Sequence, residues 1–333
     1  MKQFTYTKTS EINSAVQEGS ANKTAQQGAE IRFIAGGTTM LDLMKLMVET
    51  PNKLIDINHL PLDKIETTSG GGVKVGAMVR NSDLAHHPYI KSHYQVLSEA
   101  LLSGASPQLR NMATTGGNLL QRTRCVYFRD TEFACNKREP GSGCAAIDGD
   151  NRMMAVLGTS DKCIASNPSD MNVALMALEA TIHITGKDGD REIPISQFYT
   201  LPGNSPDVEN VLKPGDLITH VSIQPMPPGS NSTYLKLRDR ASYEFALASA
   251  AVITQVKDGK IAHARVALGA VGTIPWRSPE AESVLVGTAP TAENFRKAAD
   301  AALKDAKPQT HNKFKIELSK RCLTHALKLV TTA

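Results

Sequence analysis

The sequence lacks the features that direct a chain into a membrane or onto nucleic acid. Its 333 residues contain no apolar run near the roughly 20 residues that a membrane-spanning helix requires. The 37 Lys and Arg residues nearly balance the 33 Asp and Glu residues, and the resulting net charge of +4 is spread along the chain. We therefore expect neither membrane insertion nor nucleic-acid binding.

The first residues, MKQFTYTKTSEI, have no apolar stretch of the kind found in secretory signals. We therefore expect the chain to carry no export signal of its own. The remaining composition, with 41% hydrophobic and 21% charged residues, is that of a globular protein. At this length, two domains with sizeable cores are expected.

The order of short apolar segments predicts two domains that mix helices and strands. Up to about residue 224, short strands alternate with helices, one of them expected at 38–50. A proline-rich break, QPMPPGSNS at 224–232, separates this part from a second one. Beyond the break, alternating residues predict an antiparallel sheet followed by helices at 291–304 and 312–330.

Two glycine-rich turns have a composition that suits a dinucleotide. FIAGGTT at 33–39 places two glycines and two threonines between a strand and a helix, and ATTGGNLL at 113–120 repeats this pattern. Glycine lets the backbone approach a phosphate closely, and backbone N–H and threonine hydroxyl groups can donate to it. Neither turn matches GxGxxG or GxxxxGK[ST], so Rossmann and P-loop folds are not predicted. A single turn of this kind also suits a plain strand-to-helix connection, but the two together favour a dinucleotide.

Four of the five cysteines lie in one segment, as Cys125, Cys135, Cys144 and Cys163. Their spacing contains no CxxC, which argues against a zinc ribbon, a thioredoxin-like centre and a bacterial-type ferredoxin motif. The charged and turn-forming residues around them offer no apolar face in which unrelated thiols would be buried. Four thiolates with long connections suit a cubane iron–sulfur cluster or a tetrahedral zinc, with a disulfide pair or unrelated free thiols as the alternatives. Cys322, in a helical pattern, is predicted to be a packed thiol.

The turns and the cysteine segment together resemble a known family. The segments that carry the resemblance are FIAGGTTMLDLMK, GASPQLRNMATTGGNLLQRTRC, NPSDMNVALMALEA and LKLRDRASYEFALAS. They are similar to the flavin-binding subunit of the molybdenum hydroxylases, the group of xanthine dehydrogenase, carbon monoxide dehydrogenase and aldehyde oxidoreductase. The resemblance spans nearly the whole chain. The segment at about 122–165 resembles the FAD subunits of bacterial periplasmic aldehyde oxidoreductases, which carry an added [4Fe-4S] cluster that most flavin subunits of the group lack.

The resemblance implies an α+β fold with two domains. The first, at 1–224, would be a two-subdomain FAD-binding domain of the PCMH or vanillyl-alcohol-oxidase type, with the iron–sulfur insert at about 122–165. The second, at 230–331, would be the small α+β C-terminal domain of these subunits. By motif, the FAD pyrophosphate would be wrapped by Arg32, Phe33, Ile34, Ala35, Gly36, Gly37, Thr38, Thr39 and Met40. The second clamp would consist of Thr114, Thr115, Gly117 and Asn118.

Three further contacts with FAD follow from the same resemblance. Asp170 would face the adenosine part, Lys236 would lie near the isoalloxazine, and Leu217 would flank the ring. A lysine at that position can stabilise negative charge on the reduced flavin. Without the resemblance, Lys236 reads as an exposed strand lysine and Asp170 as a helix N-cap. The [4Fe-4S] cluster would be bound by Cys125, Cys135, Cys144 and Cys163.

The resemblance thus implies an electron-transfer subunit of a molybdenum-dependent aldehyde oxidoreductase. A large subunit would carry the molybdenum cofactor and a small subunit [2Fe-2S] centres, in a heterotrimer, and an external acceptor would take the electrons. The sequence contains no separate signature of a nicotinamide pocket, so the acceptor stays open. The alternatives are a self-sufficient FAD oxidase, for which a His/Tyr pair is missing, and a non-catalytic iron–sulfur or zinc scaffold. Without a signal, the expected location is the periplasm by co-export with a signal-bearing partner, or else the cytoplasm.

Overall fold

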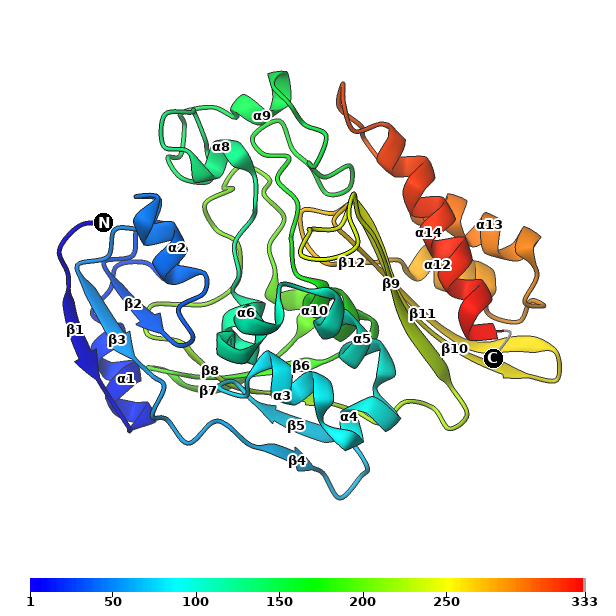
Figure 1. The fold of residues 1–333 in the computed structure, drawn as a ribbon, viewed down its shortest axis with the longest axis horizontal. Helices are drawn as coiled ribbons and strands as arrows, with labels where there is room; N and C mark the ends of the chain where they lie inside the picture. The colour runs from blue at the N-terminus through cyan, green and yellow to red at the C-terminus, as the bar shows by residue number, and fades with distance from the viewer. Residues whose placement is uncertain (332–333) are drawn as a thin grey trace.

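The computed structural model describes residues 1–331 and arranges them around three β-sheets (Figure 1). The N-terminal sheet lies at the left of Figure 1, a larger sheet at the bottom, and a third sheet at the right beside the C-terminal helices. In the described part of the chain, no helix combines the length and apolarity needed to cross a membrane. Helices and mainly antiparallel sheets in separate layers confirm the predicted α+β class.

The N-terminal sheet is parallel, with the strand order β1–β3–β2. Its elements are β1 (Thr5–Lys8), α1 (Ile12–Gly19), β2 (Ile31–Ile34), α2 (Met40–Lys45) and β3 (Lys53–Asp56). The helix predicted at 38–50 is therefore shorter than expected. Met47 has a φ of +60°, and the N–H of Val48 donates back to the carbonyl of Leu43 at 3.0 Å. A left-handed residue with such a returning hydrogen bond closes a helix before the next proline is reached.

The second sheet has five strands in the order β4–β5–β8–β6–β7, and every neighbouring pair is antiparallel. Its strands are β4 (Ile65–Thr67), β5 (Val73–Gly76), β6 (Thr181–Gly186), β7 (Gly189–Pro194) and β8 (Leu217–Ile223). Strands β6 and β7 form a hairpin in which Gly189 has a φ of +102°. This left-handed conformation is one that glycine adopts without strain.

A layer of helices separates the second sheet from the third, as Figure 1 shows. Its members are α3 (Asn81–His86), α4 (Pro88–His93), α5 (Gln95–Ser103), α6 (Pro107–Met112), α7 (Thr115–Leu119), α10 (Asp170–Ala177) and α11 (Ile195–Phe198). Helix α10 lies deepest, since every residue after Asp170 is buried. Its N-cap is Ser169, whose hydroxyl accepts a hydrogen bond from the N–H of Asn172 at 3.1 Å, and Asp170 is the first residue of the helix instead of its N-cap.

The third sheet is antiparallel, in the order β12–β11–β10–β9. It and its covering helices comprise β9 (Asn231–Leu237), β10 (Ala248–Lys257), β11 (Lys260–Gly269), β12 (Trp276–Arg277), α12 (Pro279–Leu285), α13 (Ala292–Ala302) and α14 (Phe314–Thr331). Strand β10 is buried on both faces: Ala251 and Ile253 pack toward α5 and α10, and Val252 packs toward α14. The predicted antiparallel sheet and the two long helices are thus present. Cys322 on α14 is buried, as predicted.

The cysteine segment lies at the top of Figure 1 and contains two short helices, α8 (Val126–Arg129) and α9 (Ala145–Asp148). Contrary to the prediction, it has a small apolar core, in which Phe128 and Ile164 are fully buried. Leu43 and Val48, from α2 and the residues after it, complete this core. These apolar partners are distant in sequence, so the charged residues beside the cysteines concealed them. All five cysteines are free thiols, which rules against the disulfide alternative in this structure.

Candidate functional site

The two glycine-rich turns lie against each other. A Cβ atom added to Gly36 would lie only 1.9 Å from the carbonyl oxygen of Met112, at the end of α6. The first turn can therefore approach the second only because residue 36 has no side chain. The next residue, Gly37, has a φ of +73°, and its carbonyl accepts a hydrogen bond from the N–H of Leu41 at 3.0 Å. The two glycines thus serve different needs, close approach and a left-handed turn.

The second turn is anchored by threonine hydroxyls. Thr114 Oγ1 accepts a hydrogen bond from the N–H of Gly117 at 3.1 Å, and Thr115 Oγ1 donates to the carbonyl of Val79 at 3.1 Å. The N–H of Gly116 donates to the carbonyl of Ala77 at 2.8 Å. These bonds hold the turn on the connection between β5 and α3. Hydrogen bonds within the protein therefore hold the conformation of this turn.

A pocket lies beside both turns. Many of the predicted FAD contacts line it: Arg32, Phe33, Ala35, Gly36, Gly37, Thr38, Thr39, Met40, Thr114, Gly117 and Leu217. The other predicted contacts do not line it: Ile34, Thr115, Asn118, Asp170 and Lys236. Ile34 packs with Met44 and Leu54 instead, because alternate residues of a strand face opposite sides.

Loop residues that the sequence analysis missed form the opposite wall of this pocket. Gln26 Nε2 donates to the backbone carbonyl of Asn210 at 3.1 Å and to that of Leu212 at 3.2 Å. Both Gln26 and Asn210 line the pocket, together with Lys213. These residues come from irregular segments without glycine motifs or periodicity. No local signal in the sequence distinguishes them from ordinary surface loops.

Asp170 and Lys236 form an ion pair with each other outside this pocket. Lys236 Nζ lies 2.8 Å from Asp170 Oδ2 and also donates to the carbonyl of Ser103 at 3.0 Å. The Tyr234 hydroxyl donates to the other carboxylate oxygen of Asp170. The Lys236 side chain is only 3% exposed, so the expectation of an exposed strand lysine is wrong. Any bound group that reaches one member of this pair must lie close to the other.

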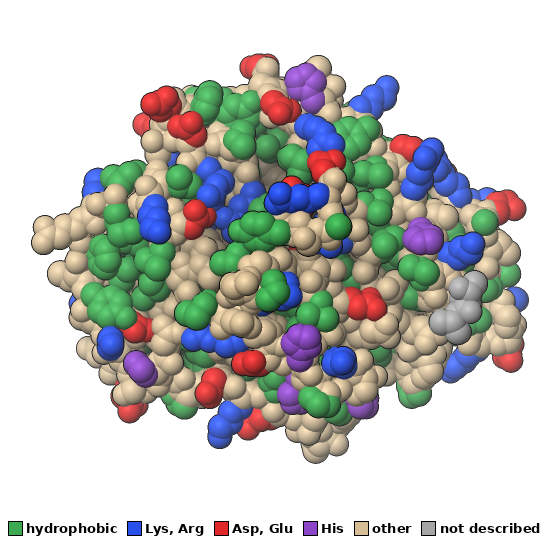
Figure 2. All heavy atoms as spheres, viewed as in Figure 1, with side chains coloured by type: hydrophobic (Ala, Val, Ile, Leu, Met, Phe, Trp, Pro, Cys, Tyr) green, Lys and Arg blue, Asp and Glu red, His purple; other side chains and the backbone are tan. Residues whose placement is uncertain are grey.

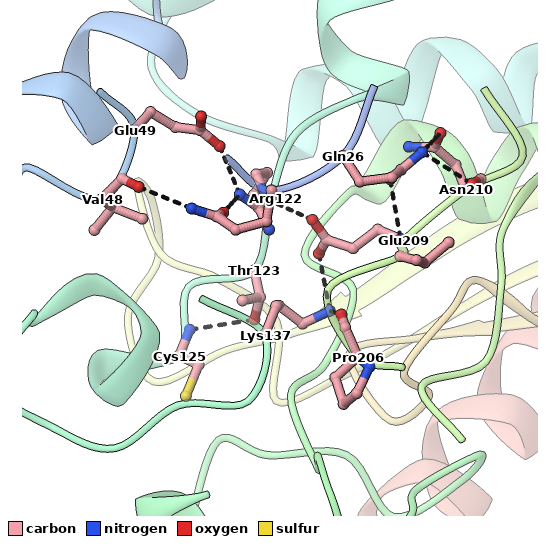
Figure 3. A network of polar contacts seen from close by, with 12 residues as sticks. Gln26, Val48, Glu49, Arg122, Thr123, Cys125, Lys137, Pro206, Glu209 and Asn210 are labelled. Atoms are coloured by element: carbon pink, nitrogen blue, oxygen red, sulfur yellow. Dashed lines mark hydrogen bonds and ion pairs between the residues drawn. The ribbon is translucent and has the colours of Figure 1, made fainter. Parts of the chain in front are cut away.

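A chain of paired charges, in which Glu49 and Lys137 are buried and Arg122 and Glu209 are half-buried, runs from the pocket toward the cysteines, as Figure 3 shows. Arg122 Nη1 lies 2.6 Å from Glu49 Oε1, and its Nε is paired with Glu209. Lys137 Nζ lies 3.0 Å from Glu209 Oε1 on the far side and donates to the carbonyl of Pro206 at 2.8 Å. Burial alone would raise the pKa of Glu209, but the charges of Arg122 and Lys137 outweigh it and hold this pKa at about 2.

The four clustered cysteines line one small cavity. Cys135 and Cys144 face each other across an isolated antiparallel bridge. Arg138 donates to the carbonyls of Tyr127 and Phe128 at 2.8 Å each, which closes the loop around the cavity. Cys125 and Cys163, the first and last of these cysteines, are 38 positions apart in the sequence and line the same cavity in the structure.

Burial makes the thiols of Cys125 and Cys163 harder to ionise than that of a free cysteine. Burial raises the pKa of Cys125 to about 12 and that of Cys163 to about 11, although the charge of Lys137 lowers the latter. Within residues 1–331, no group of three or more His, Cys, Asp or Glu residues is arranged so that it could hold a single metal ion. The four thiols therefore line one cavity without forming a preformed site for a single metal ion.

The cysteine segment is also tied to α2, the helix that follows the first glycine-rich turn. Arg124 Nη1 lies 3.2 Å from Asp42 Oδ2, and Arg129 Nη1 lies 2.8 Å from the same atom. Arg129 and Arg124 hold the pKa of the Asp42 carboxyl below its usual range, and Arg129 has the larger effect. Figure 2 shows that basic side chains gather on this face of the molecule, between α2 and the α8–α9 segment. Most of the basic residues near the cysteines are thus paired with carboxylates.

Comparison with known families gives two matches along the chain. The model for the FAD binding domain in molybdopterin dehydrogenase matches residues 2–226. The model for the CO dehydrogenase flavoprotein C-terminal domain matches residues 233–330. The first of these alone covers more than half of the chain.

Individual relatives agree with these matches. The chain is 49% identical to the aldehyde oxidoreductase FAD-binding subunit PaoB of Escherichia coli, over 98% of each chain. It is 26% identical to the carbon monoxide dehydrogenase medium chain of Hydrogenophaga pseudoflava, over 85% of this chain and 82% of the relative. The fold matches that of a CO dehydrogenase chain from Oligotropha carboxidovorans with a TM-score of 0.78 and 23% identity, covering 99% and 98% of the two chains. The chain therefore belongs to the FAD-binding medium subunits of the molybdenum hydroxylase family, which work in oxidoreductase complexes with a large and a small subunit.

Proposed function

We propose that this chain is the FAD- and [4Fe-4S]-carrying electron-transfer subunit of a molybdenum-dependent aldehyde oxidoreductase. Its partners would be a large subunit with the molybdenum cofactor and a small subunit with [2Fe-2S] centres, and an external acceptor would take the electrons. The observation that carries this proposal is the presence, in one chain, of a dinucleotide pocket and a cavity lined by four thiols, joined by paired charges. The 49% identity to an aldehyde oxidoreductase subunit supports the substrate class.

The residues of the pocket fit FAD. Gly36 and Gly37 line the pocket, and Thr38, Thr39 and Thr114 add hydroxyl donors beside them. Such a cradle suits a pyrophosphate, which backbone amides can hold without a large basic cluster. Bound FAD supplies the ability to accept and release electrons. The chain itself would bind and orient this group, and its pocket walls would limit the access of water.

The ion pair of Lys236 and Asp170 would act at the flavin ring. We assign Lys236 to the isoalloxazine, where a buried cation stabilises added negative charge. Because Asp170 is in direct contact with Lys236, the same end of FAD would face both residues. Asp170 would then hold the lysine in place, and its proposed contact with the adenosine part would require FAD to fold back on itself.

The four thiols of the cysteine cavity are suitable ligands for an iron–sulfur cluster. A single zinc draws four sulfur atoms to about 2.3 Å from one point, and no such group is preformed among the described residues. In a [4Fe-4S] cluster each thiolate binds a different iron atom, so the four sulfurs surround the group. Cys125, Cys135, Cys144 and Cys163 all line one cavity, which supports their assignment as the four ligands. Burial raises the pKa of the free thiols of Cys125 and Cys163, and a bound metal would displace their protons.

Anaerobic addition of an aldehyde to the purified complex tests the proposed role. We expect the flavin absorbance of the complete complex to bleach, while the isolated chain, mixed with the same aldehyde, keeps its absorbance. An isolated chain that oxidises the aldehyde unaided would instead identify a self-sufficient oxidase. Bleaching that requires the partner subunits would support the electron-transfer role.

The proposed location is the periplasm, reached by co-export of the folded complex with a signal-bearing partner, and the alternative is the cytoplasm. Fractionation of cells that express the complete complex tests this. We expect the chain in the periplasmic fraction only when the partner carries its signal. A chain that stays with cytoplasmic markers in the presence of that partner would decide for the alternative.

A further inference from the structure

The charges between the two sites form one unbroken path. Arg122 lines the dinucleotide pocket, and Lys137 lines the cysteine cavity. Glu209 pairs with both, and the Lys137 side chain is only 10% exposed. A further small cavity is lined by Glu209 and Lys137 and also by Cys163. The two sites are therefore connected through shared residues.

Arg122 also contacts the apolar core of the cysteine segment directly. The centre of its guanidinium lies 4.6 Å above the ring of Phe128, which itself lines the cysteine cavity. Its Nη2 atom is buried and has no hydrogen-bond partner among the described residues. The guanidinium is thus held from several sides, by Glu49, Glu209 and the ring of Phe128. It cannot move without disturbing both sites.

The sign of the charges matters for redox chemistry. Arg122 and Lys137 contribute two positive charges and Glu209 one negative charge between the sites. Interactions of buried charges are weakened much less by solvent than those of surface charges. Reduction adds negative charge to either group, and net charge near an iron–sulfur cluster is one of the factors that set its potential. A charge in this path therefore acts on both groups with the same sign.

We propose that Arg122, Glu209 and Lys137 form a charge bridge that sets the reduction potentials of the flavin and of the cysteine-bound cluster together. This inference rests on the proposed function, since it requires both groups in the chain. Lys137 lies outside the dinucleotide pocket and would act on the flavin through Glu209 and Arg122. Its role is that of a positioning and tuning residue.

Redox titration of the intact complex tests the bridge, with flavin absorbance and electron paramagnetic resonance as separate readouts. Lys137→Met removes a positive charge and leaves Glu209 paired with Arg122, so the fold is retained. We expect the reduction equilibrium of the cluster to shift about tenfold toward the oxidised form, about 59 mV for a one-electron couple. The flavin potential should fall as well, by a smaller amount.

Glu209→Gln provides a second variant with the opposite expectation. It removes a negative charge at the centre of the bridge, so both potentials should rise. Lys162→Met is the matched control, because Lys162 adjoins Cys163 but its side chain is 47% exposed and pairs with Asp161. We expect this control to leave the flavin potential unchanged.

The outcomes separate the bridge from the proposed function. Flavin and cluster potentials that move down together in Lys137→Met and up together in Glu209→Gln support the bridge. A cluster potential that moves while the flavin potential stays constant in both variants overturns it and leaves the proposed function intact. A complex in which this chain contains no iron overturns both.

Discussion

At the scale of single residues, Gly36 decides how closely the two glycine-rich turns can approach. The carbonyl oxygen of Met112 occupies the place where a side chain would begin, 1.9 Å from the ideal Cβ position. Backbone atoms of this kind cannot rotate away, in contrast to the end of a flexible side chain. The pocket wall beside the predicted pyrophosphate site therefore depends on the absence of a methyl group.

Gly36→Ala should weaken FAD binding strongly while the cysteine cavity is retained. The new methyl group must push the turn at 36–39 away from Met112, at a cost of about 1–3 kcal/mol that is typical of overpacking. Flavin content after purification and FAD titration of the apoprotein measure the effect. Gly70→Ala is the control, because nothing lies within 4 Å of its ideal Cβ. Equal FAD affinity in the two variants would count against the assignment of the first turn.

At the scale of elements, the cysteine segment depends on its neighbours for order. Its core includes Leu43 and Val48 from the first domain. Asn312, in the loop before α14, and Lys315, on α14, both donate to the backbone carbonyl of Met154, at 3.3 and 3.0 Å. The segment is therefore clamped from both sides. The sequence showed four thiols among charged residues, and these distant contacts were invisible in it.

Cys135→Ser should lose iron and loosen residues 122–165 while FAD stays bound. A serine hydroxyl is a poorer ligand for an iron–sulfur cluster than a thiolate, and without the cluster the small apolar core alone holds the segment. Iron content, flavin content and limited proteolysis report the three effects. Cys322→Ser is the matched control, because this thiol is buried on α14 away from the cavity and should leave iron unchanged. Loss of flavin with retained iron in Cys135→Ser would mean that the two sites are exchanged in our assignment.

Lys315 should make stability depend on pH through the contact between α14 and the cysteine segment. It is fully buried and donates to the carbonyls of Met153, Met154 and Ala270. Burial, assisted by the charge of Arg152, lowers its pKa to about 7, whereas the unfolded chain keeps the proton to about pH 10.4. Between these values the unfolded state binds more protons, so the free energy of unfolding should rise with pH.

Chemical denaturation at several pH values measures this dependence. Between pH 7 and 10 we expect a slope that is steeper by up to about 1.4 kcal/mol per pH unit in the wild type than in Lys315→Met. Lys313→Met, an exposed lysine two residues away, should keep the wild-type slope. Identical slopes in all three proteins would show that Lys315 has the same pKa in the folded and unfolded states.

At the scale of the whole molecule, most of the architecture could be predicted from local patterns. Helical periodicity located α13 and α14, and alternation located the third sheet, because each has one or two buried faces that repeat in sequence. The glycine-rich turns were recognisable because close backbone approach restricts the residue type. The polar wall at Gln26 and Asn210 and the path from Arg122 to Lys137 were not recognisable. They depend on tertiary contacts between loops, such as Gln26 with Asn210, which are 184 positions apart.

The difference between local patterns and tertiary contacts also explains which of the predicted residues of the candidate site line the pocket. Residues within the glycine motifs mostly line one pocket, since the motif and the local backbone conformation are linked. Asp170 and Lys236 were assigned to FAD separately, and their mutual ion pair emerges only when α10 and β9 pack together. Fold and cofactor class are thus encoded locally, and the arrangement of charges is encoded by packing.

The cofactor content of the intact complex tests the central claim most directly. A visible spectrum together with iron, zinc and flavin analysis, corrected for the partner subunits by comparison with the Cys135→Ser complex, gives the groups held by this chain. We predict flavin bands in both complexes and about four iron atoms per chain that the variant lacks. Zinc in place of iron, or a chain without flavin, would contradict the account.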